Sequence, residues 1–377
     1  MRIQIFLMKR LAVSICITTI LMVFFMPLSA RGEQSNTTQA DALQKLFLEV
    51  ERNEKLYANL KLTSNSTHLY ENFPSLDEAL KPIQSEIEFS LIAQGKKYRK
   101  QSRSTGRFMV IFPALPKDIN NPGKSSYTAT GIYESIDAFD GKTRRHFLKQ
   151  DMTAEKKTID KWASSNGEVS EEPPGLVNQA NLHIFFVQGS NRKVSLSSCL
   201  KEVESLPAFS IFSVLYKKVL KVRVAGVRIV GTEEFQGLQC TKIQIEIIDP
   251  EGTPYMRGEL WLARDRNFIP VRTLSYTYKD SKTLPNRESI VDAWREIRPG
   301  VWYPVKSHTN RFSSLSLRQE GRQKISWRTK YDVKSVSLDP PISPEVFSKV
   351  EFPPGTAVYR VKDGKRSKIK EEVKKTN

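Results

Sequence analysis

After residue 60, apolar and polar residues alternate along most of the chain, which is the period of a β-strand with one buried face. Before this region, apolar residues such as Leu46, Phe47 and Val50 recur at helical spacing over residues 40–59, and this pattern predicts an amphipathic helix. The strand segments follow one another with turns and mostly without helical patterns between them, so we expect a meandering antiparallel sheet. A sheet of at least nine such strands is expected to curl into a barrel or half-barrel.

Turn residues separate the predicted strands. Gln94-Gly95 and Asp140-Gly141 each lie between two alternating segments, and an Asp-Gly pair in this position is a strong hairpin signal. The strand series is interrupted over residues 173–221, where two segments on either side of Pro207 carry apolar residues nearly all round. Helices of this kind are buried on most of their surface, so we expect a helical insertion here. The predicted fold class is therefore α+β: a curved antiparallel sheet forming an incomplete β-barrel, with helices covering its concave side.

The first thirty residues have the pattern of a targeting segment. Lys9 and Arg10 precede an apolar run over residues 11–25, which is followed by Pro27 and a small residue, Ala30. This order is typical of a secretory signal peptide, and we expect cleavage after Ala30. The alternative is an uncleaved inner-membrane anchor, although the run is short for a membrane span of roughly 20 residues. The predicted location is therefore exported and periplasmic.

The remaining chain divides into two parts. Residues 31–361 are expected to form a single half-barrel domain that contains the insertion, because no convincing linker interrupts them. Residues 362–377 are rich in lysine, and we expect a basic, flexible tail.

Charge narrows the class of partner. The 377 residues include 59 Lys and Arg against 41 Asp and Glu, which gives a formal net charge of +18. The hydrophobic fraction of 39% is too high for a disordered chain, so the excess charge belongs to a globular protein. A dispersed positive field favours anionic partners, such as lipid head groups at a membrane surface or acidic polymers. Export makes nucleic acid the least expected of them.

The cysteine content allows one disulfide. Cys199 and Cys240 remain after removal of residues 1–30, and an exported compartment permits a bond between them. Closing a loop of roughly 40 residues would stabilise the fold by about 4 kcal/mol on the chain-entropy model. Two separate buried thiols are the alternative.

Common catalytic and metal-binding motifs are missing from the sequence. It has no His-Glu-x-x-His, Cys-x-x-Cys, glycine-rich phosphate loop or Gly-x-Ser-x-Gly motif. The four histidines share no metal-ligand spacing; they are His68, His146, His183 and His308. We therefore predict no catalytic residue, no metal and no cofactor, and a protein that is not an enzyme.

Two aromatic units stand out in the C-terminal half. The first runs from Leu260 to Arg272 with the letters LWLARDRNFIPVR, and the second runs from Gly300 to Val305 with the letters GVWYPV. Their order resembles the outer-membrane lipoprotein carrier superfamily of LolA/LolB-like exported proteins. The resemblance extends roughly over Asp41–Tyr359. It implies an incomplete antiparallel barrel wrapped over helices, with an apolar cavity for acyl chains.

The chain also departs from this family. It is longer and more basic than the carriers and lacks the lipidation cysteine of the receptors. The arginine that locks the lid of the carriers corresponds by position to Arg99, within the strand predicted over residues 97–103. The alternative for Arg99 is a solvated strand face shared with Lys97 and Arg103.

These patterns lead to two hypotheses. The first is an exported, carrier-like protein that binds a lipid or an acylated protein in an apolar cavity. The second is an envelope interaction or scaffold protein whose basic surface binds anionic partners. Strand alternation selects the cavity residues Phe89, Leu91, Ile243, Ile245, Leu260 and Leu262, and the apolar crowding in the insertion selects the lid residues Phe209, Phe212 and Leu215. The sequence does not predict the oligomeric state.

Overall fold

The chain forms two units. The computed structural model describes residues 28–71, 83–111, 126–154, 161–171, 182–186, 193–197, 206–208, 220–362 and 365–369. Residues 1–47 form the first unit and residues 48–377 the second. Helix α2 (Leu28–Glu54) begins in the first unit and supplies the opening residues of the second. This helix confirms the helical pattern predicted from apolar spacing.

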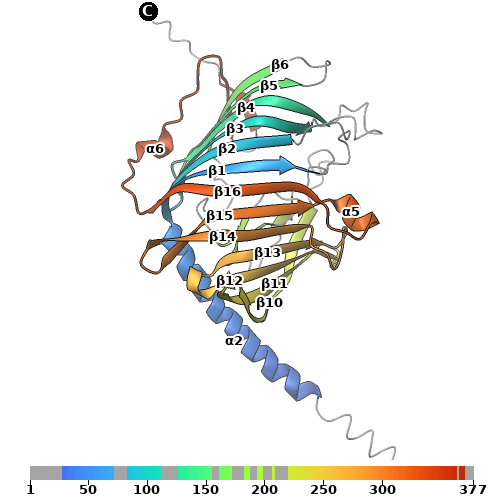
Figure 1. Cartoon of the computed structure of the whole chain (residues 1–377). Coiled ribbons are helices and arrows are strands. Elements are labelled where there is room, and N and C mark those ends of the chain that lie inside the picture. The colour runs from blue at the N-terminus through green and yellow to red at the C-terminus, as the bar shows by residue number, and fades with distance from the viewer. Residues whose placement is uncertain are drawn as a thin grey trace, which may run out of the picture. The chain divides into compact units, whose positions relative to one another are not determined.

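The second unit is built on one large sheet (Figure 1). Its 16 strands lie in the order β18-β17-β6-β5-β4-β3-β2-β1-β16-β15-β14-β13-β12-β11-β10-β9. Their bounds in chain order are β1 (Asn59–Tyr70), β2 (Ile83–Gln94), β3 (Lys97–Ile111), β4 (Ser126–Phe139), β5 (Arg144–Ala154), β6 (Lys161–Ser170), β9 (Leu206–Ala208), β10 (Leu220–Phe235), β11 (Leu238–Ile248), β12 (Pro254–Ala263), β13 (Ile269–Thr277), β14 (Arg287–Arg298), β15 (Val301–Phe312), β16 (Ile325–Leu338), β17 (Ala357–Lys362) and β18 (Lys365–Lys368). A separate pair consists of β7 (Ile184–Phe186) and β8 (Lys193–Ser195). The short helical elements of this unit are η1 (Lys55–Tyr57), η4 (Arg264–Arg266), α5 (Ser314–Gln319) and α6 (Glu345–Ser348).

The predicted fold class is wrong. The sheet is open, because its terminal strands β18 and β9 each pair with a single neighbour, and it is mixed, because β17 pairs with β6 in parallel. A barrel would require one end of the sheet to pair with the other. Instead, β6 pairs with β17, and β17 pairs with β18, so no barrel forms. The described part has few helices, and the described residues of the predicted insertion form β7, β8 and β9 with a helical pair at 196–197. Alternation along a strand identifies the strand but does not determine which edges meet.

The predicted hairpins are confirmed. β2 and β3 pair from Gln94 with Lys97, and Gly95 adopts a φ of 59° in the turn between them. At the second turn, Asp140 Oδ1 accepts hydrogen bonds from the backbone N–H groups of Lys142 and Thr143 at 2.9 and 2.8 Å. Glycine thus supplies the left-handed conformation in the first turn, and an aspartate carboxylate caps the backbone N–H groups of the second.

The two sides of the sheet differ in chemistry. Successive residues of a strand point to opposite faces, so Phe89 and Leu91 on β2 define one side, which we call the apolar face. Glu86 and Glu88 on the same strand define the other side, which we call the polar face. The main described core lies on the apolar face, where Leu62 pairs with Leu91 and packs in one cluster with Tyr303.

The C-terminal segment covers part of the polar face. The ring of Phe352 lies against Gly167 on β6, where a Cβ atom would be only 2.6 Å from Phe352 Cδ1, and the rings of Phe147 and Phe352 are 6.4 Å apart. The segment then continues as β17 and turns into β18, whose Lys368 pairs with Tyr359. The first residues of the predicted flexible tail therefore include a described strand, and residues 370–377 lie outside the described part.

Candidate functional site

The predicted cavity residues share the apolar face. Ile243 on β11 pairs with Leu260 on β12, and Ile245 and Leu262 occupy the same face of those strands. These four side chains are fully buried, and Leu91 is 3% exposed. Phe89 is partly buried against the cluster that contains Leu91. All six side chains thus lie on one face of the sheet, and none of them lines the larger of the described cavities, so the apolar cavity lining stays a prediction.

Two other predictions involve at least one residue that the structure does not describe. The lid residues Phe209, Phe212 and Leu215 lie outside the described residues. Cys240 is a buried thiol that has no disulfide partner among the described residues; its Sγ donates to the carbonyl of Leu238 at 3.4 Å, and burial raises its pKa to about 11. Cys199 also lies outside the described residues, so the disulfide stays a prediction.

Both aromatic units of the sequence meet at one asparagine. Asn267 closes the turn between β12 and β13 in the left-handed conformation, with a φ of 57°. Its side-chain Oδ1 accepts a hydrogen bond from the backbone N–H of Trp302 at 2.9 Å, and its Nδ2 donates to the carbonyl of Gly300 at 3.0 Å. The turn that precedes β13 is thus joined to the turn that precedes β15. The two aromatic units that stand out in the sequence are therefore joined at this junction.

Two buried side chains complete the Asn267 junction. Tyr57, at the end of η1, donates its hydroxyl to Asn267 Oδ1 at 3.1 Å and to the carbonyl of Trp302 at 2.6 Å. His183 Nε2 lies 2.7 Å from the carbonyl of Asn267, and this contact requires the tautomer with a proton on Nε2 because a carbonyl can only accept. Burial raises the pKa of Tyr57 and lowers the pKa of His183 to about 4, and both groups are therefore neutral at pH 7. The sequence contained no sign of this long-range network beyond an asparagine in a turn.

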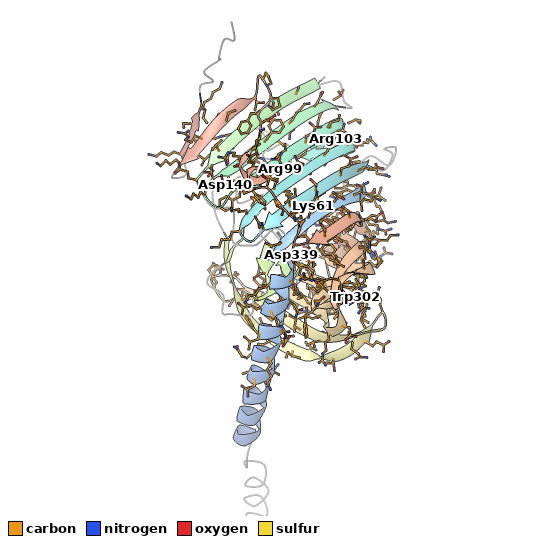
Figure 2. The ribbon with its side chains drawn as sticks, turned by 90° about the vertical axis from the view of Figure 1, so that its left-hand side faces the viewer. Lys61, Arg99, Arg103, Asp140, Trp302 and Asp339 are labelled. Carbon is orange, nitrogen blue, oxygen red and sulfur yellow. The ribbon has the colours of Figure 1, made fainter. Side chains whose placement is uncertain are left out.

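Arg99, whose position on the sheet is labelled in Figure 2, is hydrogen-bonded to the segment around α6. Its Nη1 donates to the carbonyls of Val346 and Lys349 at 3.3 and 2.5 Å, beside α6. Burial lowers its pKa, and the nearby Glu351 opposes that shift. Arg99 therefore fastens a segment to the polar face and is not simply a solvated strand residue.

A polar groove opens on the polar face. It has a volume of about 790 Å³ and lies over β1, β2, β3, β14, β15 and β16. We call it the polar groove. Its charged and ionisable side chains are Glu86, Glu88, Asp292, Asp332, Lys306, His308, Arg328, Lys330 and Lys334. The groove is therefore not the apolar cavity predicted from the sequence, and its residues were not among the predicted sites.

Several charges in the polar groove are already paired. Asp292 accepts from His308 Nδ1 at 2.8 and 2.9 Å, and Asp332 accepts from Lys334 Nζ at 2.7 Å. A histidine oriented by a carboxylate can serve as a general base when a nucleophile lies within hydrogen-bond reach. No hydroxyl or thiol is hydrogen-bonded to His308 within the described part of the chain, so we assign no catalytic role to this pair.

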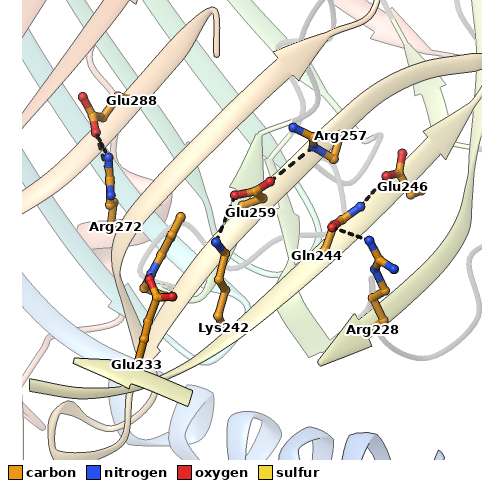
Figure 3. Close-up of polar contacts among 10 residues, drawn as sticks. Arg228, Glu233, Lys242, Gln244, Glu246, Arg257, Glu259, Arg272 and Glu288 are labelled. Carbon is orange, nitrogen blue, oxygen red and sulfur yellow. Dashed lines mark hydrogen bonds and ion pairs between the residues drawn. The ribbon is translucent and has the colours of Figure 1, made fainter. Parts of the chain in front are cut away.

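A charged ladder continues the polar face across β10–β14 (Figure 3). Glu259 forms ion pairs with both Lys242 and Arg257 at 3.3 Å, and Arg272 pairs with Glu288 at 2.7 Å. Lys242 Nζ also lies 4.3 Å from the centre of the Trp261 ring, a cation–π contact. These charges neutralise one another within the sheet. The ladder therefore stabilises its own strands and leaves little charge for a ligand.

The described residues contain no membrane-spanning helix and no cluster of metal-binding side chains. No helix in the described part combines the length and apolar content that a membrane span requires. No group of three or more His, Cys, Asp or Glu side chains with metal-binding geometry occurs among the same residues.

Comparison with known proteins gives neighbours among solved structures. No family model and no curated protein matches the chain. A DUF1329 family protein from Desulfovibrio piger is 12% identical, with a TM-score of 0.35, over 82% of this chain and 97% of that one. A domain from Vibrio parahaemolyticus, provisionally named for outer membrane lipoprotein sorting, is 8% identical, with a TM-score of 0.37, over 82% of this chain and 96% of that one.

A third neighbour is a beta-barrel-like protein of the DUF1849 domain type from Brucella abortus. It is 10% identical, with a TM-score of 0.26, over 76% of this chain and 99% of that one. The chain's structural neighbours thus include DUF1329 and lipoprotein-sorting domain proteins. Their sequence identities and TM-scores are too low to support an inference about function.

Proposed function

We propose that this chain is an exported, non-enzymatic, carrier-like protein that binds a lipid or an acylated protein on the apolar face of its sheet. The observation that supports this function best is the position of the six predicted side chains. Phe89 and Leu91 come from β2, while Ile243, Ile245, Leu260 and Leu262 come from β11 and β12, and all share one face of a sheet that does not close. An acyl chain on this face would gain about 0.8 kcal/mol for each CH₂ group removed from water.

Unpartnered polar atoms on the same sheet also favour a ligand with a polar end. Thr329 Oγ1 and Trp327 Nε1, both on β16, are buried and have no hydrogen-bond partner among the residues that the structure describes. Leaving such a group unsatisfied costs about 1–3 kcal/mol, so native proteins rarely do so without a ligand or a bound water. An ester or amide at the end of an acyl chain supplies the missing partners. Because these apolar side chains are already shielded from water, binding has to expose them first.

Acyl binding can be tested with a fluorescent fatty acid. Phe89→Asp places a charge on the partly buried rim of the apolar face and should weaken uptake at least tenfold, because the carboxylate must be desolvated beside the acyl chain. The matched control is Ile92→Asp, on the opposite face of β2, which should bind as the unmodified protein does. Native mass spectrometry of protein purified from its own envelope should also find a bound lipid. Equal uptake by the two variants, or no uptake and no lipid, would remove the proposal.

A second candidate function rests on the hairpin formed by β17 and β18. Its five bases are exposed and lie at one end of the sheet: Arg360, Lys362, Lys365, Arg366 and Lys368. Arg366 is additionally held over the ring of Tyr359 at 3.9 Å. A cluster of this kind attracts anionic surfaces with about 1 kcal/mol for each Lys or Arg. This observation favours an envelope interaction protein that docks on anionic lipid.

Vesicle sedimentation can test the hairpin. The protein should sediment with vesicles of phosphatidylglycerol and phosphatidylcholine at 1:3, and should do so less as salt is raised. The variant K362Q/K365Q/K368Q should lose at least tenfold in affinity. The control K61Q/K279Q/K282Q removes the same charge from exposed positions elsewhere and should lose far less. Equal losses would show that only net charge matters, and the hairpin would then have no specific role.

A further inference from the structure

The polar groove separates its unpaired charges by sign. Glu86 and Glu88 on β2 form one wall, which we call the acidic wall, and Lys306 on β15 with Lys330 on β16 form the other, the basic wall. All four side chains are exposed. None of them makes an ion pair or hydrogen bond within the described part of the chain, in contrast to the charged ladder on the neighbouring strands. Lys306 lies in register opposite Asp332 and attracts that carboxylate, but among the described residues no wall side chain is held in an ion pair, so the groove presents two walls of opposite sign.

Strand register places the two walls on either side of β1. Glu88 pairs with Asn65 on β1, which pairs with Asp332 on β16, and Asp332 pairs with Lys306. In the next row on the same face, Glu86 pairs with Thr67, which pairs with Lys330. Neighbouring strands are about 4.8 Å apart, so Glu86 and Lys330 rise from backbones separated by roughly 10 Å. A small ligand can span this distance because both kinds of side chain are long.

The other carboxylates of the polar groove are each bonded to a neighbouring base. Asp332, the acid nearest the basic wall, is bonded to Lys334, and this hydrogen bond holds the pKa of Asp332 below its ordinary value. Asp292 is bonded to His308. The free carboxylates of the groove are thus confined to β2, and the free ammonium groups are confined to β15 and β16.

We propose that the polar groove binds a zwitterion that carries a primary ammonium and a phosphate. Two carboxylates suit an ammonium, which is a compact donor of three hydrogen bonds. Two lysines suit a phosphate, which lysine binds as a point charge. A ligand with one charge alone would satisfy one wall and leave the other unpaired. This chemistry occurs in free phosphoethanolamine and in the head group of a lipid that contains it.

Isothermal titration can test this proposal with phosphoethanolamine, ethanolamine and inorganic phosphate as separate probes. Phosphoethanolamine should bind at least tenfold more tightly than either half, and its affinity should fall as salt is raised. The variants E86Q/E88Q and K306Q/K330Q should each lose that advantage, because each removes one wall. All four positions are exposed, so these neutral substitutions leave the core untouched.

The control changes one acid and one base outside the groove, in E234Q/K282Q, and should bind phosphoethanolamine as the unmodified protein does. Inorganic phosphate that binds as tightly as phosphoethanolamine, or wall variants that bind normally, would overturn the proposal.

A vesicle arm with phosphatidylethanolamine identifies the source: uptake that depends on both walls assigns a lipid head group, and binding of the soluble zwitterion alone assigns a free metabolite. The groove and the apolar face lie on opposite sides of β2, so fatty-acid binding should be unchanged in the wall variants, which separates this test from that of the proposed function.

Discussion

Replacing Asn267 with alanine should lower the free energy of unfolding by about 2–4 kcal/mol, the sum of two effects. The first is the loss of the acceptor of the Trp302 N–H, which bonds to Asn267 Oδ1, while the Tyr57 hydroxyl loses Oδ1 but keeps the carbonyl of Trp302 at 2.6 Å. Each buried group left without its partner costs about 1–3 kcal/mol. The second is conformational, because alanine tolerates the left-handed φ of 57° poorly and costs a further 1 kcal/mol or so.

Urea denaturation at pH 7 measures this loss. Asn267→Gly separates the two effects, because glycine adopts the left-handed conformation freely but carries no side-chain amide. We expect the glycine variant to recover only the conformational part. Asn53→Ala is the matched control: within the described part of the chain its Nδ2 bonds only to the carbonyl of Glu49 on the same helix, so the change should cost under about 1 kcal/mol. An Asn267→Ala variant as stable as Asn53→Ala would refute the structural role of the junction.

Acidification should destabilise the protein through His183 before most carboxylates titrate. Burial lowers the pKa of His183 to about 4, from an ordinary value of 6.5. Between these two values the unfolded chain binds a proton that the folded chain does not, so stability is complete above pH 6.5 and falls as the pH drops toward 4. The total loss from this group is about 3 kcal/mol.

The free energy of unfolding at pH 7.0, 5.5 and 4.5 measures this dependence. His183→Gln keeps a side-chain N–H donor for the Asn267 carbonyl but does not titrate, so its stability should vary less over the same range. The variant is expected to be less stable at pH 7, because glutamine does not match the buried ring, and the informative quantity is the slope. An unchanged slope would show that another group controls the acid response.

Local patterns predicted which residues form strands and which way their side chains point. Alternation placed Phe89 and Leu91 on one face of β2 and Glu86 and Glu88 on the other, because the period of a strand is fixed by backbone geometry. The two hairpins at Gly95 and Gly141 followed from turn chemistry, which is equally local. These features depend on neighbours in the sequence, and the sequence therefore contained enough information for them.

The prediction of the fold class was wrong because the fold depends on pairing between strands that are far apart in the sequence. β17 joins β6 across nearly two hundred positions, from Ala357 to Asn166, and no local pattern indicates that partner. The polar groove is formed in the same way, by Glu86 and Lys330 brought to either side of β1. The Asn267 junction joins residues 210 positions apart. The apolar helical pattern of residues 208–220 lies largely outside the described residues, so the lid derived from it stays a prediction.

The last strand bears on how such a sheet stays soluble. An open sheet exposes a row of backbone donors and acceptors at each end, and a second copy could add its own strand there and continue indefinitely. At one end of this sheet that outermost strand reads Lys-Arg-Ser-Lys, from Lys365 to Lys368, and every residue in it is exposed. Two copies that approached through these strands would bring like charges together within a few ångströms, a spacing that disfavours pairing. The charges on this strand therefore disfavour continued addition of strands from other copies at this end of the sheet.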